Sequence, residues 1–590
     1  MENKSYLDNV IDFMVSKNNL KYLVLLFIIG ILLRSLVAIS VPPNADEMLH
    51  APHAINFINS GKLQIMDQDP IWFFLTDLSY KIFGISLFSA RFLSIIFGAL
   101  SIIALYLIVS LVYNKRLALI ASIILTFSSF HILMSLAEMD VAMTFFVLSS
   151  LFFFIKYLKE KREIYAIFSY ILLGIAILTK QIAIMFLPAM LIVLVYYKLK
   201  NKEKITLKHF GVFILIMIII SLPVLTFNYL LYKDKGLVDL QFSRFAGIAK
   251  ETYAPIEATL KPFKLKDVFF SYESHEPGII EGLGFFYNFD KIVLMLGILG
   301  FILALFLGKE FLLLFALSFL FPFIFLSGTS LLEYHFIFGI PILAIFAAIF
   351  LDFLGEKLSK FRLKKKVTIS VMLLLIIIFS VLFLNKIGVF SGKSEITKLM
   401  SYSKENINEN SLVLVDSRIY RGRIVFSFND KHYLEASQLN ELVNIQGNLP
   451  GNFIGLNTYF IECIIDDCGW GTVNNQPEFN SSMEGIVNYF KGNSSLLTTI
   501  SNRRDEPQFN VYNTTLNLKE SSLELADSTH EWFYYPLRYE KESFDDYSAN
   551  GSFDKLLDKI AHLVLYLEII IALLVPIVLI YFLLKDKDEA

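Results

Sequence analysis

Charged residues are scarce in this sequence. Asp, Glu, Lys and Arg make up 18% of its 590 residues, whereas soluble domains carry about 25%. Hydrophobic residues reach 55%, and the mean hydropathy is +0.59. A soluble protein of this composition could not cover its apolar surface with polar groups, so the composition indicates a membrane protein. The net charge of -2 also gives no global basic signal for nucleic acid as a partner.

Cysteine is almost absent as well. The only two cysteines, Cys463 and Cys468, are separated by four residues in a polar C-terminal segment. They could close a small disulfide loop, which needs an oxidising compartment, or they could be free thiols. The same segment holds N-x-Ser/Thr sequons, although such sequons also arise by chance in Asn- and Ser-rich sequence. The sequons begin at Asn480, Asn493, Asn513 and Asn550.

Long apolar runs, by contrast, are plentiful. A helix that spans a bilayer needs ~20 mainly apolar residues. We predict about twelve spans, at 21–41, 84–112, 117–136, 140–156, 164–179, 182–198, 210–232, 291–308, 310–327, 335–354, 367–385 and 561–584. The first follows a polar leader without a small-residue cleavage site, so we expect a retained helix rather than a signal peptide. The predicted fold class is mainly α, a polytopic bundle of membrane helices.

The positions of Lys and Arg predict the orientation of this bundle. With the N-terminus in the cytoplasm, the loops that fall inside are rich in Lys and Arg. The loops that fall outside are mixed or acidic and include the longest ones, at 42–83, 233–290 and 386–560. We therefore expect a multi-pass protein of the cell or ER membrane, with both termini cytoplasmic.

Changes in hydrophobicity and composition along the sequence divide the chain into three parts. Residues 1–385 form a membrane part, 386–560 an extracytoplasmic soluble part, and 561–584 a closing membrane helix. Within the soluble part, runs such as 411–415 and 423–427 lie between Asn, Gly and Asp clusters and are typical of strands and turns. About 175 residues suffice for one soluble core, so we predict one small α/β or β-rich domain there.

The external loop 42–83 contains two adjacent carboxylates, Asp46 and Glu47, directly after the prolines that end the first span. Stretches 48–60 and 71–83 have helical spacing of apolar residues. This spacing predicts two helices that lie along the membrane surface, although an ordinary connecting loop is the alternative. Adjacent carboxylates have little structural purpose at such a place, so we interpret the pair as part of a functional site.

Other polar side chains fall at the same, external ends of the predicted spans. Polar residues near spanning helices are costly and tend to be functional, and these groups could hold an anion or move a proton. They are Asp69, Lys81, Arg91, Glu138, Asp140, Lys180, Arg244, His275, Glu333, Tyr334 and His335. Each also has a structural explanation: Asp140 could cap a helix, and Lys180 could reach toward the membrane interface. If they form one site, then Asp46, Asp140, Lys180 and His335 should line one external cavity.

The order of these motifs resembles the membrane glycosyltransferases with the GT-C fold, in particular the protein O-mannosyltransferases and the bacterial lipid A aminoarabinose transferases. The resemblance covers about residues 1–355. Its motifs stand here as Asp46-Glu47 after helix one, Arg91 at the start of helix two, Glu138-Met-Asp140 before helix four, Gly174-Ile-Ala-Ile-Leu-Thr-Lys180, and Glu333-Tyr-His335 ahead of Pro341. The family's His-Pro-Pro motif is replaced by Gln68-Asp69-Pro70, which removes the histidine.

The resemblance implies a sugar donor linked to a polyprenyl or dolichyl phosphate, and a hydroxyl acceptor on protein, glycan or lipid. Attack by the acceptor on the anomeric carbon, with inversion, would release the lipid phosphate. A carboxylate that takes the acceptor's proton contributes ~10²–10⁴-fold. Asp46 is the expected base, with Glu47 and Asp140 in support.

Cations should stabilise the charge that gathers on the leaving phosphate. By the same resemblance the candidates are Lys180, Arg244, His335 and Arg91, and Arg91 could instead orient the acidic loop, which Asp69 would also support. No motif demands a cofactor, but hard carboxylate oxygens could bind a divalent cation. The carboxylates in question are Asp46, Glu47, Asp69 and Asp140.

Other functions compete with this one. A transporter or lipid flippase would carry charges at mid-membrane on discontinuous helices, whereas the charges here cluster at external helix ends. A receptor-like protein would work through residues 386–560, which contain no recognisable metal or nucleophile constellation. An oligosaccharide-transferring enzyme of the same fold ranks lower because its Trp-Trp-Asp signature is absent.

Overall fold

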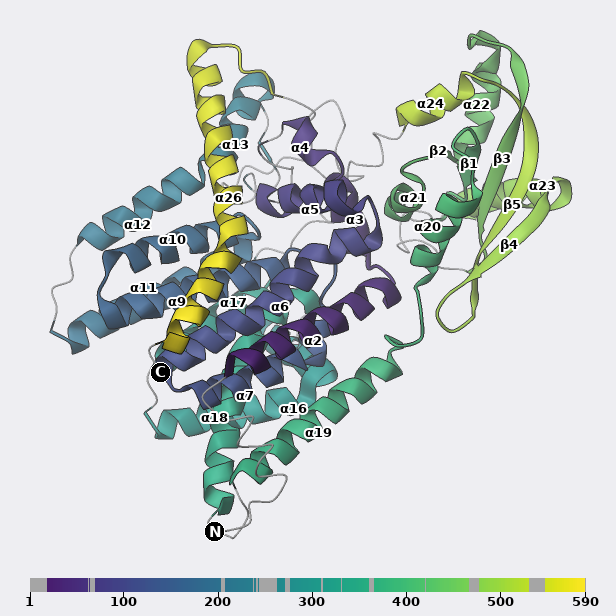
Figure 1. The fold of residues 1–590 in the computed structure, drawn as a ribbon. Helices are drawn as coiled ribbons and strands as arrows, with labels where there is room; N and C mark the ends of the chain where they lie inside the picture. The colour runs from purple at the N-terminus through teal and green to yellow at the C-terminus, as the bar shows by residue number, and fades with distance from the viewer. Residues whose placement is uncertain are drawn as a thin grey trace.

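The structure of the chain is a computed structural model. It describes residues 19–61, 63, 69–202, 207–236, 238–239, 242, 263–270, 276–308, 311–329, 332–359, 365–419, 421–465, 477–529 and 547–588. Figure 1 shows a bundle of helices with a smaller part, built around a β-sheet, set to one side of it.

The helices α2–α19 and α26 make up what we call the membrane bundle. Its elements are α2 (Asn19–Ser40), α3 (Ala45–His53), α4 (Phe57–Ser60), α5 (Pro70–Phe83), α6 (Leu87–Val112), α7 (Lys115–Thr126), α8 (Ser129–Leu133), α9 (Asp140–Glu160), α10 (Glu163–Ile177), η1 (Gln181–Met185), α11 (Phe186–Lys200), α12 (Leu207–Ile220), α13 (Leu222–Lys235), α15 (Leu265–Phe269), α16 (Gly278–Phe306), α17 (Leu312–Ser327), η4 (Glu333–Phe338), α18 (Gly339–Ser359), α19 (Lys365–Lys386) and α26 (Ser552–Asp588).

Within the described residues, eight helices are long and apolar enough to cross a membrane, and the bent pair α12 and α13 would make a ninth. The protein is therefore an integral, multi-pass membrane protein. Helix α9 runs through the interior of the bundle, where it packs against α6 and α10, and nearly all of its residues are buried. The short helices α3, α4 and α5 follow α2 and confirm that the loop after the first span is helical.

Four predicted spans differ from the structure. The span predicted at 210–232 is bent by 55° between α12 and α13. The spans predicted at 164–179 and 310–327 are shorter apolar helices, α10 and α17. The span predicted at 117–136 breaks into α7 and α8. The break has a local cause: Ser128 caps α8 by accepting a hydrogen bond from the His131 backbone N–H at 3.1 Å, and its hydroxyl donates to Asp290 of α16.

The second part of the chain, which we call the sheet part, contains a five-stranded mixed sheet with strand order β2-β1-β3-β5-β4. Strands β1 and β2 and strands β1 and β3 pair in parallel, whereas β3 with β5 and β4 with β5 pair antiparallel. Its elements are α20 (Glu395–Asn406), β1 (Leu412–Val415), α21 (Arg421–Phe428), β2 (His432–Glu435), η5 (Ala436–Gln438), α22 (Leu439–Ile445), η6 (Gln446–Asn448), β3 (Phe453–Cys463), α23 (Pro477–Asn493), β4 (Ser495–Ser501), β5 (Pro507–Lys519) and α24 (Ser522–Thr529).

The predicted strand at 423–427 is wrong, because this run lies inside helix α21. Strands β1 and β2 are parallel, and parallel neighbours need a crossover connection that is usually a helix. Ile424 and Phe428, four residues apart on α21, are both buried in the core against the sheet. The run that suggested a strand therefore lies on the crossover helix, with Ile424 in the core against the sheet and Phe426 in contact with the bundle.

Several contacts hold the sheet part against the end of α2. Helix α21 packs on α3, and its Phe426 ring meets Tyr80 of α5. The Ser394 backbone N–H, ahead of α20, donates to the Ile39 carbonyl at 3.1 Å. Figure 1 shows α20 and α21 between the sheet and α3. The sheet part therefore lies at the same end of the bundle as the acidic loop.

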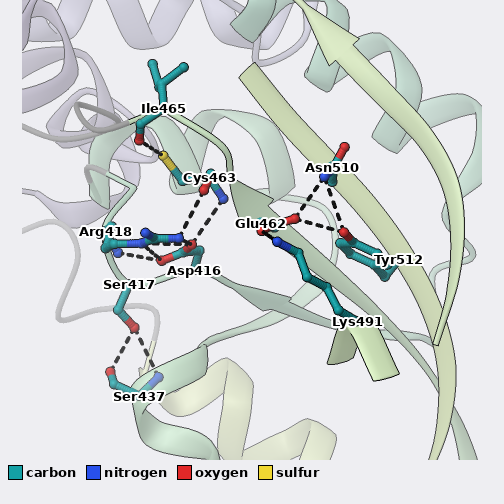
Figure 2. Close-up of polar contacts among 10 residues, drawn as sticks. All are labelled: Asp416, Ser417, Arg418, Ser437, Glu462, Cys463, Ile465, Lys491, Asn510 and Tyr512. Carbon is teal, nitrogen blue, oxygen red and sulfur yellow. Dashed lines mark hydrogen bonds and ion pairs between the residues drawn. The ribbon is translucent and has the colours of Figure 1, made fainter. Parts of the chain in front are cut away.

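Figure 2 shows polar contacts in the sheet part. Asp416, directly after β1, accepts hydrogen bonds from the Arg418 guanidinium and from the Cys463 backbone N–H. Cys463, at the end of β3, is disulfide-bonded. Cys468, which we considered as its disulfide partner, lies outside the described residues.

Candidate active site

The acidic loop begins with a helix that its own residues cap. The Asn44 side chain accepts a hydrogen bond from the Glu47 backbone N–H at 2.7 Å, and the Glu47 carboxylate accepts one from the Asn44 backbone N–H at 3.0 Å. This reciprocal capping box fixes the start of α3 at Ala45. Successive residues of a helix point about 100° apart, so Asp46 and Glu47 face different surroundings.

Glu47 points into the protein and is fully buried. Its two oxygens accept hydrogen bonds from Nε and Nη2 of Arg91, each at 2.7 Å, and Oε1 also accepts one from the Ala137 backbone N–H at 2.5 Å. The third nitrogen of Arg91 donates to carbonyls at the end of α2, including that of Val41 at 2.8 Å. The Glu47–Arg91 pair thus ties α2, α3, α6 and the turn before α9 together.

Asp46 points the other way and is only partly buried. Its carboxylate accepts a hydrogen bond from the hydroxyl of Tyr334, which belongs to η4. Residues 46 and 334 are far apart in the sequence, so this contact brings the acidic loop against the segment that precedes α18.

Asp140, at the start of α9, lies between two nitrogen groups. The Lys180 ammonium donates to its Oδ2 at 2.6 Å, and Nδ1 of His335 lies 3.3 Å from its Oδ1. Lys180 Nζ is 3.0 Å from His335 Nδ1 and 5.6 Å from the centre of the Tyr334 ring. The Asp140 side chain is 1% exposed, whereas those of Lys180 and His335 are 14% and 13% exposed. The two nitrogen groups, but not the acid, can therefore reach an added ligand.

We call Asp46, Asp140, Lys180, Tyr334 and His335 the acid–lysine cluster. The structure brings these residues together from α3, the start of α9, the turn before η1, and η4. Asp46, Asp140, Lys180 and His335 are the residues we expected to share one site, and the structure places them in one connected network. Their chemical roles stay predictions.

Two further ionisable residues border this cluster. Nδ1 of His50, on α3, lies 3.5 Å from Oε2 of Glu138 in the turn before α9. Burial raises the pKa of Glu138 to about 7, although His50 beside it acts in the opposite direction. Sequence reasoning placed Glu138 outside without giving it a role and did not single out His50. A signal was present, because residues 46 and 50 are four apart and share one face of α3.

The other predicted site residues have different surroundings. Arg244, His275 and Gln68 lie outside the described residues. Asp69 is buried at the start of α5. Burial together with the nearby Asp239 carboxylate raises its pKa to about 8, although a hydrogen bond with Gln181, the neighbour of Lys180 in the chain, acts in the opposite direction. Arg91 is fully buried and all three of its nitrogens are engaged, which suits orientation of the acidic loop better than the phosphate binding that we also considered.

The carboxylates considered for a divalent cation do not form a ligand set. In the part of the chain that the structure describes, no group of three or more His, Cys, Asp or Glu side chains could hold a metal ion. Glu47 is paired with Arg91, and Asp140 is paired with Lys180. Each of these carboxylates already faces a cation of the protein.

Comparisons with known proteins agree with this architecture. Residues 67–227 match the family described as dolichyl-phosphate-mannose-protein mannosyltransferase. This stretch includes Asp69, Arg91, Asp140 and Lys180, but neither Asp46 nor His335. An uncharacterized protein of Aquifex aeolicus is 25% identical over 196 residues, which are 33% of this chain and 39% of the relative's length.

A solved structure extends the likeness to most of the chain. ArnT from Cupriavidus metallidurans, in a crystal structure bound to undecaprenyl phosphate, aligns with a TM-score of 0.54 at 13% identity, covering 84% of this chain and 98% of ArnT. The apo oligosaccharyltransferase of Archaeoglobus fulgidus gives a TM-score of 0.49 at 13% identity over 77% of this chain and 70% of that one. The chain therefore has the GT-C fold of ArnT, and the resemblance predicted from its motifs is confirmed.

Proposed function

We propose that this protein is a membrane glycosyltransferase that moves a sugar from a polyprenyl- or dolichyl-phosphate donor to an acceptor hydroxyl, with Asp46 as general base. The observation that carries the proposal is the acid–lysine cluster. It joins carboxylates and a partly exposed ammonium at one end of the bundle, in a chain whose fold matches an undecaprenyl-phosphate-bound transferase. The predicted orientation makes this the extracytoplasmic end.

The cluster contains groups suited to both halves of the reaction. The acceptor hydroxyl must lose a proton as its oxygen attacks the anomeric carbon, and Asp46 is a partly exposed carboxylate that can take it. Negative charge then gathers on the departing lipid phosphate, and the Lys180 ammonium can stabilise it. Lys180 is already bonded to Asp140, so that carboxylate would hold the ammonium in place. The Tyr334 hydroxyl would orient the base.

Charge placement favours this function over a transporter or flippase. The acid–lysine cluster lies at helix ends and in the turns between them, where a lipid phosphate at the membrane surface can meet a polar acceptor. An enzyme acting on a lipid-linked donor needs its reactive groups at that depth, because the lipid tail stays in the bilayer.

The test is transfer of a radiolabelled sugar from a polyprenyl-phosphate donor by membranes that contain the protein. Asp46→Asn keeps the shape of the side chain but removes the base, so transfer should fall by ~10²–10⁴-fold. Asp430→Asn, at an exposed carboxylate of the sheet part, is the matched control and should leave transfer unchanged. Equal transfer by Asp46→Asn and the parent protein would show that Asp46 is not the general base. If the parent protein transfers sugar from none of the lipid-linked donors, the result favours the rival functions.

A further inference from the structure

The mechanism above leaves one buried acid of the site unused. Glu138 lies in the turn before α9, and its side chain is 1% exposed. The His50 ring lies against it, with Nδ1 3.5 Å from Oε2. Among the described residues, no hydrogen-bond partner lies closer than this to either carboxylate oxygen of Glu138. A buried carboxyl group that lies beside a histidine ring can exchange a proton with it, so the surroundings of Glu138 point to a task.

The position of Glu138 is fixed by the structure around it. The neighbouring Ala137 backbone N–H donates to Glu47 at 2.5 Å, and the Ser94 hydroxyl donates to the Glu138 carbonyl at 3.2 Å. Glu47 is in turn held by Arg91 and follows Asp46 in α3. The same buried pair therefore orients both the proposed base and this second carboxyl group.

The charges around Glu138 come from every element packed against it. They act in opposite directions: His50 and Lys180 lower its pKa, whereas the Asp46 carboxylate raises it. Burial outweighs them, and the resulting pKa of about 7 lets the group gain or lose a proton near neutral pH. The groups concerned are Asp46 and His50 on α3, Lys180 before η1 and Tyr334 on η4, while Arg91 on α6 is neutralised by Glu47. Asp140, two residues further along the chain, is paired with Lys180.

We propose that Glu138, held by His50, is a proton-relay residue that acts through Asp46. The proposal rests on the proposed function and extends it. In the transfer step the acceptor O–H bond breaks and its proton goes to Asp46. The new glycosidic C–O bond forms while the bond from the anomeric carbon to the phosphate oxygen breaks, leaving its electron pair on the phosphate. The proton then passes from Asp46 to Glu138, and through the His50 ring to solvent, which returns Asp46 to its ionised form.

The pH profile of sugar transfer tests this relay. Glu138 must be ionised to accept the proton, so kcat of the parent protein should rise with pH through an inflection near 7. Glu138→Gln cannot accept a proton, so it should lose that inflection and lower kcat by at least about tenfold. His50→Gln removes a partner that lowers the Glu138 pKa, so the inflection should move to higher pH. Glu138→Asp should restore a titrating group in part.

Two results would overturn the relay. If Glu138→Gln slows transfer equally at every pH and keeps the inflection, the residue only supports the structure. If His50→Gln leaves the inflection where it is, His50 does not act on Glu138. Infrared difference titration of the resting protein gives an independent readout, because the band of a protonated carboxyl group that disappears near pH 7 should be missing in Glu138→Gln. Parent protein that transfers no sugar would instead overturn the proposed function itself.

Discussion

The polar clusters of the sheet part and the acid–lysine cluster of the bundle use similar residues in opposite ways. In the sheet part, Glu462 accepts hydrogen bonds from Lys491 at 2.5 Å, from Asn510 at 2.8 Å and from Tyr512 at 2.9 Å (Figure 2). Asp416 is held in the same complete manner by Arg418 and a backbone N–H. Each carboxylate has donors of its own, so these networks hold the sheet together.

The acid–lysine cluster is arranged differently. Lys180 is shared between Asp140 and His335, and Asp46 is bonded to a neutral hydroxyl rather than to a cation. The cluster and the adjoining Glu138 therefore hold more carboxylates than fixed positive charges, and its two nitrogen groups are partly exposed. A network whose acids share donors can exchange a protein partner for a substrate, whereas a network with a donor for every acid cannot.

Variants of the Glu47–Arg91 pair test whether a bundle carboxylate that has its own donors stabilises the fold, as in the sheet part. Arg91→Met should destabilise the protein by about 3–5 kcal/mol, because Glu47 would stay buried without its cation. Unfolding by denaturing detergent measures the loss. The double variant Glu47→Gln with Arg91→Met should lose less than the sum of the two single changes. Additive losses would show that the two residues do not depend on each other.

The Lys180 ammonium should matter for the reaction more than for the fold. Lys180→Met removes the cation that faces the leaving phosphate, and we expect transfer to fall by about 10²–10³-fold, as for loss of one donor to a developing anion. Binding of undecaprenyl phosphate, measured by quenching of protein fluorescence, should weaken as well. Lys81→Met, at a partly exposed lysine of α5, is the control. If Lys180→Met binds undecaprenyl phosphate as tightly as the parent protein does, the donor phosphate does not bind at this site.

The smallest effect is expected in the sheet part. Lys491 is 47% exposed, and Glu462 keeps its bonds to Asn510 and Tyr512 without it. Lys491→Met should therefore change stability by about 0–1 kcal/mol, as for other exposed ion pairs, and leave transfer unaltered. The detergent titration and the transfer assay measure both quantities. A large loss of transfer would show that the sheet-part network takes part in the reaction.

Local sequence patterns predicted much of the bundle. The apolar runs gave the positions of α2, α6, α9, α18, α19 and α26, and two prolines marked the end of α2. They missed the break between α7 and α8, because the residue that holds it, Asp290, comes from a helix more than 150 positions away. They also mistook α21 for a strand, because the need for a crossover helix arises only from the parallel pairing of β1 with β2.

The candidate site shows the same division. The motifs indicated that Asp46, Asp140, Lys180 and His335 belong together. They could not distinguish Asp46 from Glu47, which are adjacent and chemically alike. The structure distinguishes the two: Glu47 forms a buried ion pair with Arg91, whereas Asp46 accepts a hydrogen bond from the Tyr334 hydroxyl. Nor could the motifs pair His50 with Glu138, since that contact joins α3 to the turn before α9.

By itself the sequence determined that this is a membrane protein, that its spans follow long apolar runs, and that many of its polar side chains lie at one set of helix ends. Composition and periodicity carry this information because the transfer of a segment into lipid depends on that segment alone. Only the tertiary structure decided which acids are structural and which remain available for chemistry. That distinction depends on which donors other segments bring within hydrogen-bond distance, and on how completely those segments exclude water.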